Sequence, residues 1–270
     1  MKRNLTLLTC MFFVVVGFIG CSDESGNGRG AVGRLVVAID YEYCEEDYEE
    51  KEFYSYEFQY DDVGRLTDMM FYYNGHEEDH AEYTYSANTI YAIDSNCEET
   101  IEWELNTRGL VNTRVLSSDD YEYVYRYNYG TDGLLSSVRL SMDNTSQETE
   151  YERANGNIVR VSDTQKDNLS GSAYIREYYY TYTNYVDKSN LDIMAVIGNT
   201  CLIYPCDITE IDKTTFMSLG NKNLPKSFKS PIDNENWTFT YDFDKSGDLK
   251  EIDVFLNDKR YIHVSVKYNN

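Results

Sequence analysis

The stretch YSYEFQYDDVGRLTDM, residues 54–69, decides the fold of this 270-residue chain. Aromatic and polar residues alternate up to Tyr60, which is the period of two that a β-strand with one apolar face produces. Gly64 follows, and apolar residues resume at Leu66 and Met69. Glycine readily takes the positive φ that closes a short hairpin turn, and the gap of three residues after Leu66 fits a β-bulge that resets the register. The stretch therefore predicts a β-hairpin.

The same frame recurs along the chain. Its turn positions are Gly64, Asn88, Gly109, Gly133, Gly156 and Gly247, and the first five are 24, 21, 24 and 23 residues apart. Asn88 takes the place of glycine as a residue that tolerates positive φ. Each interval has the length of two strands and two turns, so we expect a series of hairpins.

The alternation gives each strand one tyrosine-rich face and one polar face. We therefore expect an all-β fold, an antiparallel meander of hairpins that forms a curved or barrel-like sheet. Because the apolar positions are largely tyrosines and the opposite positions carry charge, we also expect this sheet to be water-soluble rather than a membrane barrel with an apolar outer band. The pattern weakens after Tyr182, predicts a less regular insertion near 191–230, and resumes at Trp237.

Residues 1–20 are typical of a lipoprotein signal peptide, with two basic residues ahead of an uncharged, mostly apolar run. The run is too short to span a bilayer comfortably, which takes about 20 predominantly apolar residues. It ends in Phe-Ile-Gly before Cys21, which resembles the lipobox of lipoprotein signal peptidase. Phe18 departs from the usual leucine, so an ordinary signal peptide with a stray cysteine is the alternative.

Lipidation of Cys21 would provide the two or more acyl chains that stable membrane anchoring needs. Residues 21–33 are polar and glycine-rich, which predicts a flexible tether. The acidic residues after Cys21 resemble the signal that sends lipoproteins of gut Gram-negative anaerobes to the outer face of the outer membrane. An acidic linker without an addressing role is the alternative. We expect a lipid-anchored protein of the outer membrane that faces the cell surface.

The chain is strongly acidic, with 47 Asp and Glu against 24 Lys and Arg and a formal net charge of −23. Loss of the signal peptide removes two basic residues and no acids, which makes the mature chain more acidic still. Since binding to nucleic acid depends on cationic contacts with phosphate, we expect no nucleic-acid partner.

Four cysteines besides Cys21 lie in the mature chain, namely Cys44, Cys97, Cys201 and Cys206. In an oxidising compartment they allow three pairings, of which we favour Cys201 with Cys206 and Cys44 with Cys97. A zinc site is the competing interpretation, but neither pair has C-x-x-C spacing and no histidine lies near either one.

Four segments of the chain carry a family resemblance. They are YDDVGRL (60–66), YTYTNYVDKSNLDI (180–193), LGNKNLPKS (219–227) and WTFTYDFDKSGDLKEI (237–252). They resemble bacterial lipoproteins that carry the domain of unknown function with porin-like fold, over nearly all of residues 34–270. The resemblance implies a single porin-like all-β domain and says nothing of its chemistry. The first segment also resembles repeats of large secreted shell proteins, although one good copy is too few to prefer that assignment.

A stretch near the C-terminus fits the spacing of a calcium loop. Positions 1, 3, 5, 6, 7 and 12 of that pattern would be Asp242, Asp244, Ser246, Gly247, Asp248 and Asp253. An EF-hand needs flanking helices and a glutamate at position 12, whereas this stretch is a predicted hairpin turn, where Asp, Ser and Gly serve the turn itself. We therefore expect no cofactor and keep calcium as the alternative.

Histidines offer weaker candidates. His76 and His80 would share a face and could hold zinc on a helix, but Asn74-Gly75 just before them predicts a hairpin turn with a solvated acidic loop. His263 is expected to pack rather than to catalyse.

We do not expect an enzyme. No G-x-S-x-G motif or Ser, His and Asp set stands out, and among 47 acids accidental carboxylate pairs are common. We expect a surface-exposed binding module for a glycan or a peptide, since exposed aromatic rings stack on sugars and acids accept hydroxyl hydrogen bonds. Most of the 27 tyrosines should nevertheless fill the core. The alternatives are a scaffolding component of the outer membrane and a glycoside hydrolase, which would place paired carboxylates with a raised pKa in a pocket.

Overall fold

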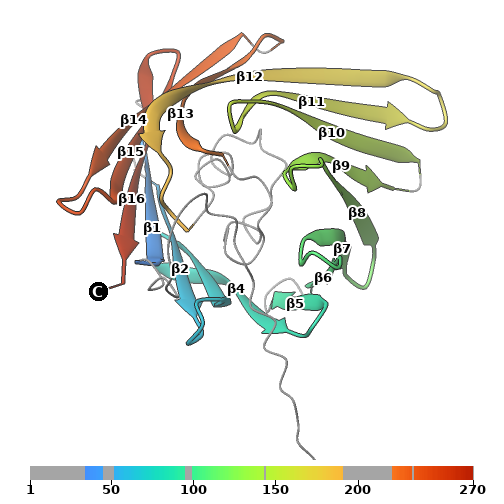
Figure 1. Ribbon diagram of the computed structural model, residues 1–270, viewed down its shortest axis with the longest axis horizontal. Coiled ribbons are helices and arrows are strands. Elements are labelled where there is room, and N and C mark those ends of the chain that lie inside the picture. Colours follow the sequence, from blue (N-terminus) through green and yellow to red (C-terminus); the bar gives the residue numbers. More distant parts are fainter. Residues whose placement is uncertain are drawn as a thin grey trace, which may run out of the picture. The chain divides into compact units, whose positions relative to one another are not determined.

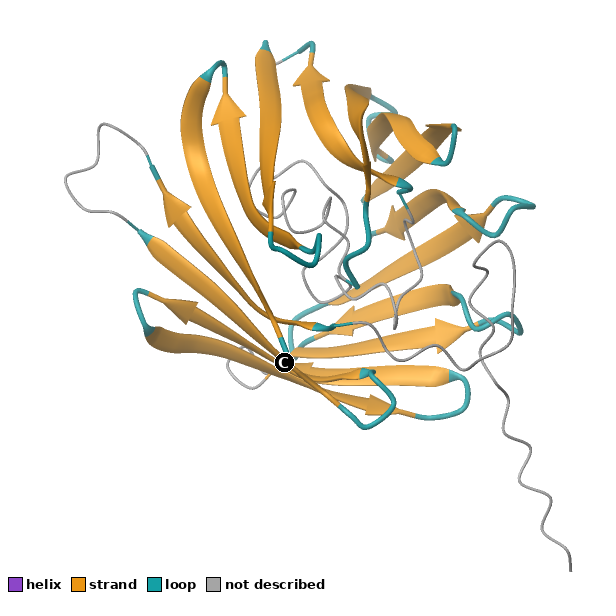
Figure 2. Cartoon of the chain, turned by 60° about the vertical axis from the view of Figure 1, so that its left-hand side comes forward, coloured by secondary structure: helices purple, strands orange, loops and turns teal. Residues whose placement is uncertain are grey.

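The computed structural model (Figure 1) describes residues 34–44, 52–94, 99–142, 144–190, 221–232 and 234–269. The predicted signal peptide, the tether and the stretch 191–220 lie outside these residues. The chain divides into two units, Met1–Gly30 and Ala31–Asn270, and the second contains everything described below. All regular elements of the described residues are β-strands (Figure 2). None of these residues belongs to a helix long and apolar enough to cross a membrane.

The strands pair in the order of the sequence and form one closed barrel of sixteen. Every pair is antiparallel, including the pair of first and last strands. The bounds are β1 Val36–Tyr43, β2 Phe53–Tyr60, β3 Leu66–Tyr73, β4 His76–Tyr85, β5 Thr89–Asp94, β6 Glu99–Leu105, β7 Val111–Ser117, β8 Glu122–Tyr129, β9 Leu135–Ser141, β10 Thr145–Ala154, β11 Asn157–Asp167, β12 Ala173–Val186, β13 Asn223–Ser230, β14 Glu235–Phe243, β15 Leu249–Leu256 and β16 Lys259–Tyr268.

Closure corrects the sequence prediction of a curved or barrel-like, water-soluble sheet. Val36 pairs with Tyr268 and Tyr43 with Ile262, so β1 and β16 join into a continuous ladder. Alternation along one strand defines its two faces, but it cannot show that two strands at opposite ends of the chain will meet. Nor does that alternation establish that a closed barrel is water-soluble, and that part of the prediction is not supported.

The glycine turns form as the sequence predicts. In the first of them Gln59 pairs with Asp68 but Tyr60 pairs with Leu66, which leaves Thr67 as the extra residue of a bulge. The same register shift occurs between β6 and β7, between β8 and β9 and between β14 and β15. The glycines at these turns have φ values between 76° and 83°, and they are Gly64, Gly109, Gly133 and Gly247. The predicted bulge is confirmed, and it explains why apolar residues three apart can both be buried.

A side-chain oxygen closes each of these turns. Oδ1 of Asp61 accepts hydrogen bonds from the backbone N–H groups of Val63 and Arg65, at 3.0 and 2.9 Å. Asn106 and Asp244 do the same in their own turns. Gly130 stands where the others have Asp or Asn, and there Asp132 Oδ1 accepts from the N–H of Leu134 instead. Such Asx turns are the physical reason for the recurring Asp and Asn.

Asn88 does not behave as predicted. Its φ is not positive, because another side chain closes the β4–β5 turn: Ser86 accepts from the N–H of Thr89 through its hydroxyl, at 3.1 Å. The turn at Gly156 also differs from the others. Asn155 and Gly156 have φ values of 54° and 82°, which makes it a two-residue turn.

One hydrophobic cluster receives side chains from all sixteen strands. The largest of its fully buried side chains, each less than 2% exposed, are Trp103, Ile39, Leu66, Ile158, Leu224, Ile252 and Ile262. A closed barrel encloses only one of its faces, so these residues point inward. Residues that alternate with them, such as Glu57 and Gln59, are exposed. Burying one such large apolar side chain contributes about 1.5–3 kcal/mol.

Hydrogen bonds from tyrosine hydroxyls link neighbouring strands at one end of the barrel. Tyr60 donates to the carbonyl of Val36 at 2.8 Å, and Tyr85 donates to that of Leu66 at 2.6 Å. Tyr241 donates to the carbonyl of Pro225 at 2.5 Å. Each hydroxyl reaches the start of the preceding strand, beside the glycine turns. We call this end, which carries the turns at Gly64, Gly109, Gly133, Gly156 and Gly247, the glycine end, and the opposite one the far end.

Candidate functional site

A cavity of about 270 Å³ lies toward the far end, on the inward face of the wall formed by β2 to β7. We call it the rim pocket. It is lined by aromatic, aliphatic and acidic residues, namely Tyr56, Met69, Phe71, Asp79, His80, Ala81, Asp94, Glu99, Ile101 and Leu116. Several of these belong to the buried cluster or pack against it, so the pocket is continuous with the core.

Strand register brings the three acids together. Asp94 ends β5, pairs with Ala81 of β4 and also pairs with Glu99, the first residue of β6. Asp79 lies two residues before Ala81 and therefore on the same face of β4. On each of these strands the inward-facing residues are apolar in the middle of the barrel and acidic at its far end. The chain has 47 acids, and no local pattern in the sequence distinguishes these three from the others.

Crowding of the carboxyl groups changes their chemistry. Burial raises the pKa of Asp79 to about 6, helped by a hydrogen bond with Asp94 and by repulsion from Asp94 and Glu99. The backbone N–H of His80, which donates to Oδ1 of Asp79 at 2.8 Å, acts in the opposite direction. Asp79 therefore keeps its proton up to about pH 6.

Aromatic rings adjoin the acids. The Tyr56 and Phe71 rings lie 4.9 Å apart with an interplanar angle of 32°, and the Tyr54 ring stacks on Phe71 at 5.9 Å. Tyr121, stacked on Tyr123 at 4.7 Å, donates its hydroxyl to Glu99, and this hydrogen bond raises the pKa of Tyr121. Carboxylate acceptors and aromatic faces thus lie side by side at one place on the wall.

A second cavity of about 560 Å³ lies on the outward face of β1, β2, β3 and β16. We call it the outer cleft. One row of paired residues crosses it, in which Ser265 pairs with Asp40, Asp40 with Ser55, and Ser55 with Tyr72. His263, Glu42 and Phe53 also line it. Its lining is therefore acidic, with Phe53 and Tyr72 as aromatic groups.

His263 has hydrogen-bonding partners that its sequence position did not suggest. It pairs across the hairpin with Asp253, whose Oδ1 lies 2.8 Å from Nδ1 of the imidazole. Oγ of Ser265 lies 3.4 Å from Nε2. The expectation of simple packing missed this Ser, His and Asp set. A signal was available, since Asp253 and His263 flank the turn at Asn257-Asp258 at nearly equal distances.

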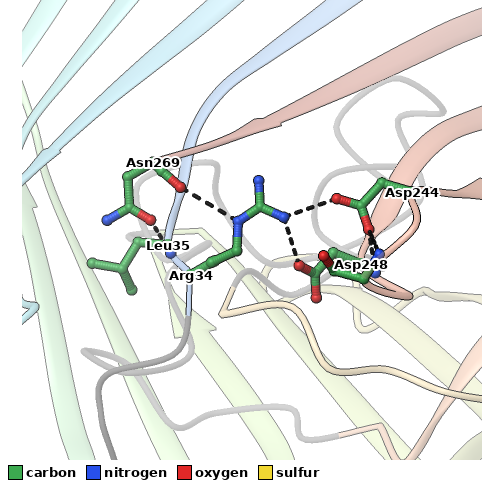
Figure 3. A network of polar contacts seen from close by, with 6 residues as sticks. Arg34, Leu35, Asp244, Asp248 and Asn269 are labelled. Carbon is green, nitrogen blue, oxygen red and sulfur yellow. Dashed lines mark hydrogen bonds and ion pairs between the residues drawn. The ribbon is translucent and has the colours of Figure 1, made fainter.

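The residues of the predicted calcium loop are distributed among different partners. Nη1 of Arg34 lies 2.8 Å from Asp244 and 2.9 Å from Asp248 (Figure 3), and the hydrogen bond from Arg34 lowers the pKa of Asp244. Ser246 contributes its N–H to Asp244 at 2.8 Å. Asp253 pairs with Arg260 and His263, and Asp242 lies 4.0 Å from Lys250. In the described part of the chain, no group of three or more His, Cys, Asp or Glu side chains is arranged to hold a metal ion. Calcium stays the untested alternative.

The cysteine predictions fall largely outside the described residues, as do Cys21, Cys97, Cys201 and Cys206. Cys44 is half-buried, its Sγ lies 3.5 Å from the carbonyl oxygen of Glu42, and its predicted partner Cys97 is outside the described residues. The predicted pairings therefore stay predictions.

The predicted turn before His76 is confirmed. Asn74 and Gly75 have φ values of 47° and 80°. The predicted acidic loop after the turn is wrong, because His76–Tyr85 form strand β4. Nε2 of His80 lies 3.4 Å from the carboxylate of Asp68.

Solved structures that resemble this barrel include two porin-like proteins. A porin-like protein from Bacteroides uniformis ATCC 8492 superposes with a TM-score of 0.61 at 14% identity, over 87% of this chain and 96% of that one. The chain has a porin-like fold. A porin-like protein from Bacteroides vulgatus ATCC 8482 gives the same score, identity and coverage of this chain, over 99% of its own length. No protein-family model and no curated protein matches the sequence. The resemblance noted from sequence is thus confirmed for the porin-like fold, and membership in the lipoprotein family stays a prediction.

Proposed function

We propose that this protein is a lipid-anchored lipoprotein of the outer membrane that binds glycans at the cell surface through the rim pocket. The observation that carries the proposal is the placement of Asp79, Asp94 and Glu99 beside the rings of Tyr56 and Phe71 in one cavity. The sequence suggested acids and aromatic residues as ligand-binding groups without naming positions. The barrel brings these five residues together.

The chemistry of the pocket suits a sugar. Ionised carboxylates only accept hydrogen bonds, and sugar hydroxyls donate them. Aromatic rings offer large apolar faces for the C–H faces of a sugar ring. A cavity of about 270 Å³ lies just below the roughly 300–1,000 Å³ of typical ligand pockets. It therefore suits the end of a glycan, with the rest of the chain passing over the rim.

The negative charge of the protein limits the class of ligand that the pocket can bind. The formal net charge of the chain is −23, and three carboxyl groups face the rim pocket. Sulfated or uronic-acid glycans would be repelled by this field. The pocket therefore favours neutral or amine-bearing glycans.

The place where the described chain begins is consistent with display of the pocket. Arg34, where the described chain begins, is bound to Asp244 and Asp248 at the glycine end. A lipid on Cys21 would hold the barrel through this end. The rim pocket lies toward the far end, at the Asp94–Glu99 connection, and would be free to meet large ligands.

Glycoside hydrolysis is a second candidate, and the pKa of Asp79 favours it, since a carboxyl that holds its proton near pH 6 can serve as a general acid. Its geometry argues against it. Asp79 and Asp94 are in hydrogen-bonding contact, whereas hydrolysing pairs are separated by about 5–10 Å. Binding without cleavage is therefore the better-supported function.

The test is a glycan array probed with the fragment that begins at Gly33, followed by calorimetric titration of each hit. The double variant Asp94→Asn/Glu99→Gln should lose binding at least tenfold and keep its melting temperature. The matched control, Asp242→Asn at the glycine end, should bind as the parent does. Equal binding by all three proteins, or no binding at all, would contradict the proposal. Shortened chains in the eluted glycans would favour the hydrolase.

Anchoring has its own test. Cys21→Ala should move the protein from the membrane fraction to the soluble fraction and abolish labelling with a palmitate analogue. Retention of the variant in membranes would show that anchoring does not depend on Cys21.

A further inference from the structure

We propose that Ser265, His263 and Asp253 form a second, hydrolytic site on the outward face of the barrel, which cleaves neutral esters of small acyl groups bound in the outer cleft. The proposal is independent of the glycan-binding function, since these residues lie on the opposite face of the wall from the rim pocket. They alternate along β15 and β16 with the buried residues Ile252, Val254, Ile262, Val264 and Val266.

The three side chains stand in the order that acyl transfer requires. Nδ1 of His263 faces Asp253 Oδ1 at 2.8 Å, and Nε2 faces Ser265 Oγ at 3.4 Å. With Nδ1–H donating to the carboxylate, Nε2 is the nitrogen free to accept a proton from the serine. The Nε2–Oγ distance is slightly longer than a hydrogen bond in an assembled triad, as is common in ligand-free sites.

Neighbouring groups hold the array in place. Arg260 Nη2 lies 2.7 Å from the same Oδ1 of Asp253. The side chains of His263 and Asp253 are 22% and 33% exposed, so both are partly shielded from water, and His263 lines the cleft. Asp253 therefore orients the imidazole and stabilises its charged form during the reaction.

The charges that face the array decide the substrate class. Asp40 lines the cleft beside Ser265 and is paired with Lys267 Nζ at 2.6 Å. Glu251 pairs in register with Ser265 on the other side. These carboxylates repel anionic substrates and leave neutral esters. Lys267, which forms the ion pair with Asp40, is two residues after Ser265 on the same face of β16 and is the nearest cation along that strand.

The cleft offers room and an apolar wall. Its volume of about 560 Å³ lies within the roughly 300–1,000 Å³ of ligand pockets. Phe53, 48% exposed, and Tyr72 line the cleft, and their rings can cover the acyl group.

The reaction proceeds in two balanced steps. Ser265 Oγ attacks the ester carbonyl carbon while His263 Nε2 takes its proton. The bond from that carbon to the alcohol oxygen then breaks, and the alcohol leaves with the proton from His263. Water attacks the acyl-serine with His263 as base, and the proton returns to Ser265 as the carboxylic acid departs. One ester and one water thus give one acid and one alcohol.

The experiment uses the fragment from Gly33, p-nitrophenyl acetate as substrate and a fluorophosphonate probe as covalent label. Ser265→Ala and His263→Gln should each lower the rate of hydrolysis by roughly 100-fold or more. Mass spectrometry should place the probe on Ser265. The matched control is Ser137→Ala, an outward-facing serine of β9 whose hydroxyl accepts from the Asn128 amide at 3.1 Å, and it should hydrolyse as the parent does.

The proposal is overturned if the parent neither hydrolyses the ester nor takes up the probe, if the probe labels another residue, or if Ser265→Ala retains the parental rate. If Ser265→Ala lowers the melting temperature, its rate no longer tests the proposal. The rate of His263→Gln and the residue that carries the probe then show whether the site is catalytic. Loss of labelling in His263→Gln at an unchanged melting temperature supports the array.

Discussion

Replacing Tyr241 with phenylalanine tests whether tyrosine hydroxyls hold the glycine end together. The hydroxyl donates to the carbonyl oxygen of Pro225 at 2.5 Å, and burial raises the pKa of Tyr241 well above its ordinary value. The backbone pairing of β13 with β14 begins only at Ser227, and Pro225 lies before that point. The Tyr241 hydroxyl therefore links β14 to a part of β13 that the ladder does not reach. Phenylalanine keeps the ring and its packing and removes only the donor.

The expected cost follows from the acceptor left behind. A buried acceptor that loses its donor costs about 1–3 kcal/mol, and the lower half of that range applies here because the site is only partly buried. About 1–2 kcal/mol corresponds to a fall in melting temperature of roughly 2–8 °C for a domain of this size.

Urea unfolding followed by tryptophan fluorescence measures the effect, with an unchanged m-value as the sign that only stability has altered. The control is Tyr179→Phe, whose hydroxyl donates to Glu177 at 2.9 Å on a residue that is 43% exposed. That variant should unfold at the parental midpoint. Equal midpoints for Tyr241→Phe and the parent would refute the argument that these hydroxyls stabilise the barrel.

Further outcomes follow from the turns, the rim pocket and the predicted sites. Gly247→Ala should cost about 1–2 kcal/mol, because φ is 82° there and alanine resists the left-handed region; Gly247→Asn should recover part of it, and urea midpoints compare the two. The pKa of Asp79 rises from 3.8 to about 6 on folding. The folded state therefore binds more protons between these values, and stability should fall as pH rises from about 4 to about 6. Asp79→Asn should flatten that dependence in thermal melts. A calcium site would raise the melting temperature on calcium addition, and no response to calcium or chelator would rule it out. Alkylation and peptide mass spectrometry should find Cys201 bonded to Cys206, and free thiols there would refute the pairing.

The sequence by itself determined the local units. Tyr60, Gly64, Leu66 and Met69 were enough to predict a strand, a turn with positive φ and a bulge, and the structure confirms all three. These features depend on groups within a few residues of one another, so the information needed lies in one short stretch. Asn88 shows the limit of such local prediction. The hydroxyl of Ser86 closes that turn, so no residue with positive φ is needed there.

Only the tertiary structure decided how the hairpins assemble. A period of two assigns side chains to faces, but it fixes neither the number of strands in a sheet nor its curvature, and so not the closure of β1 on β16. The sites depend on that assembly. Asp79, Asp94 and Glu99 meet through the registers of three strands, and Arg34 meets Asp244 across the closure of the barrel. Contacts between residues far apart in the chain form only when the whole sheet has its register, and a local pattern carries no information about them.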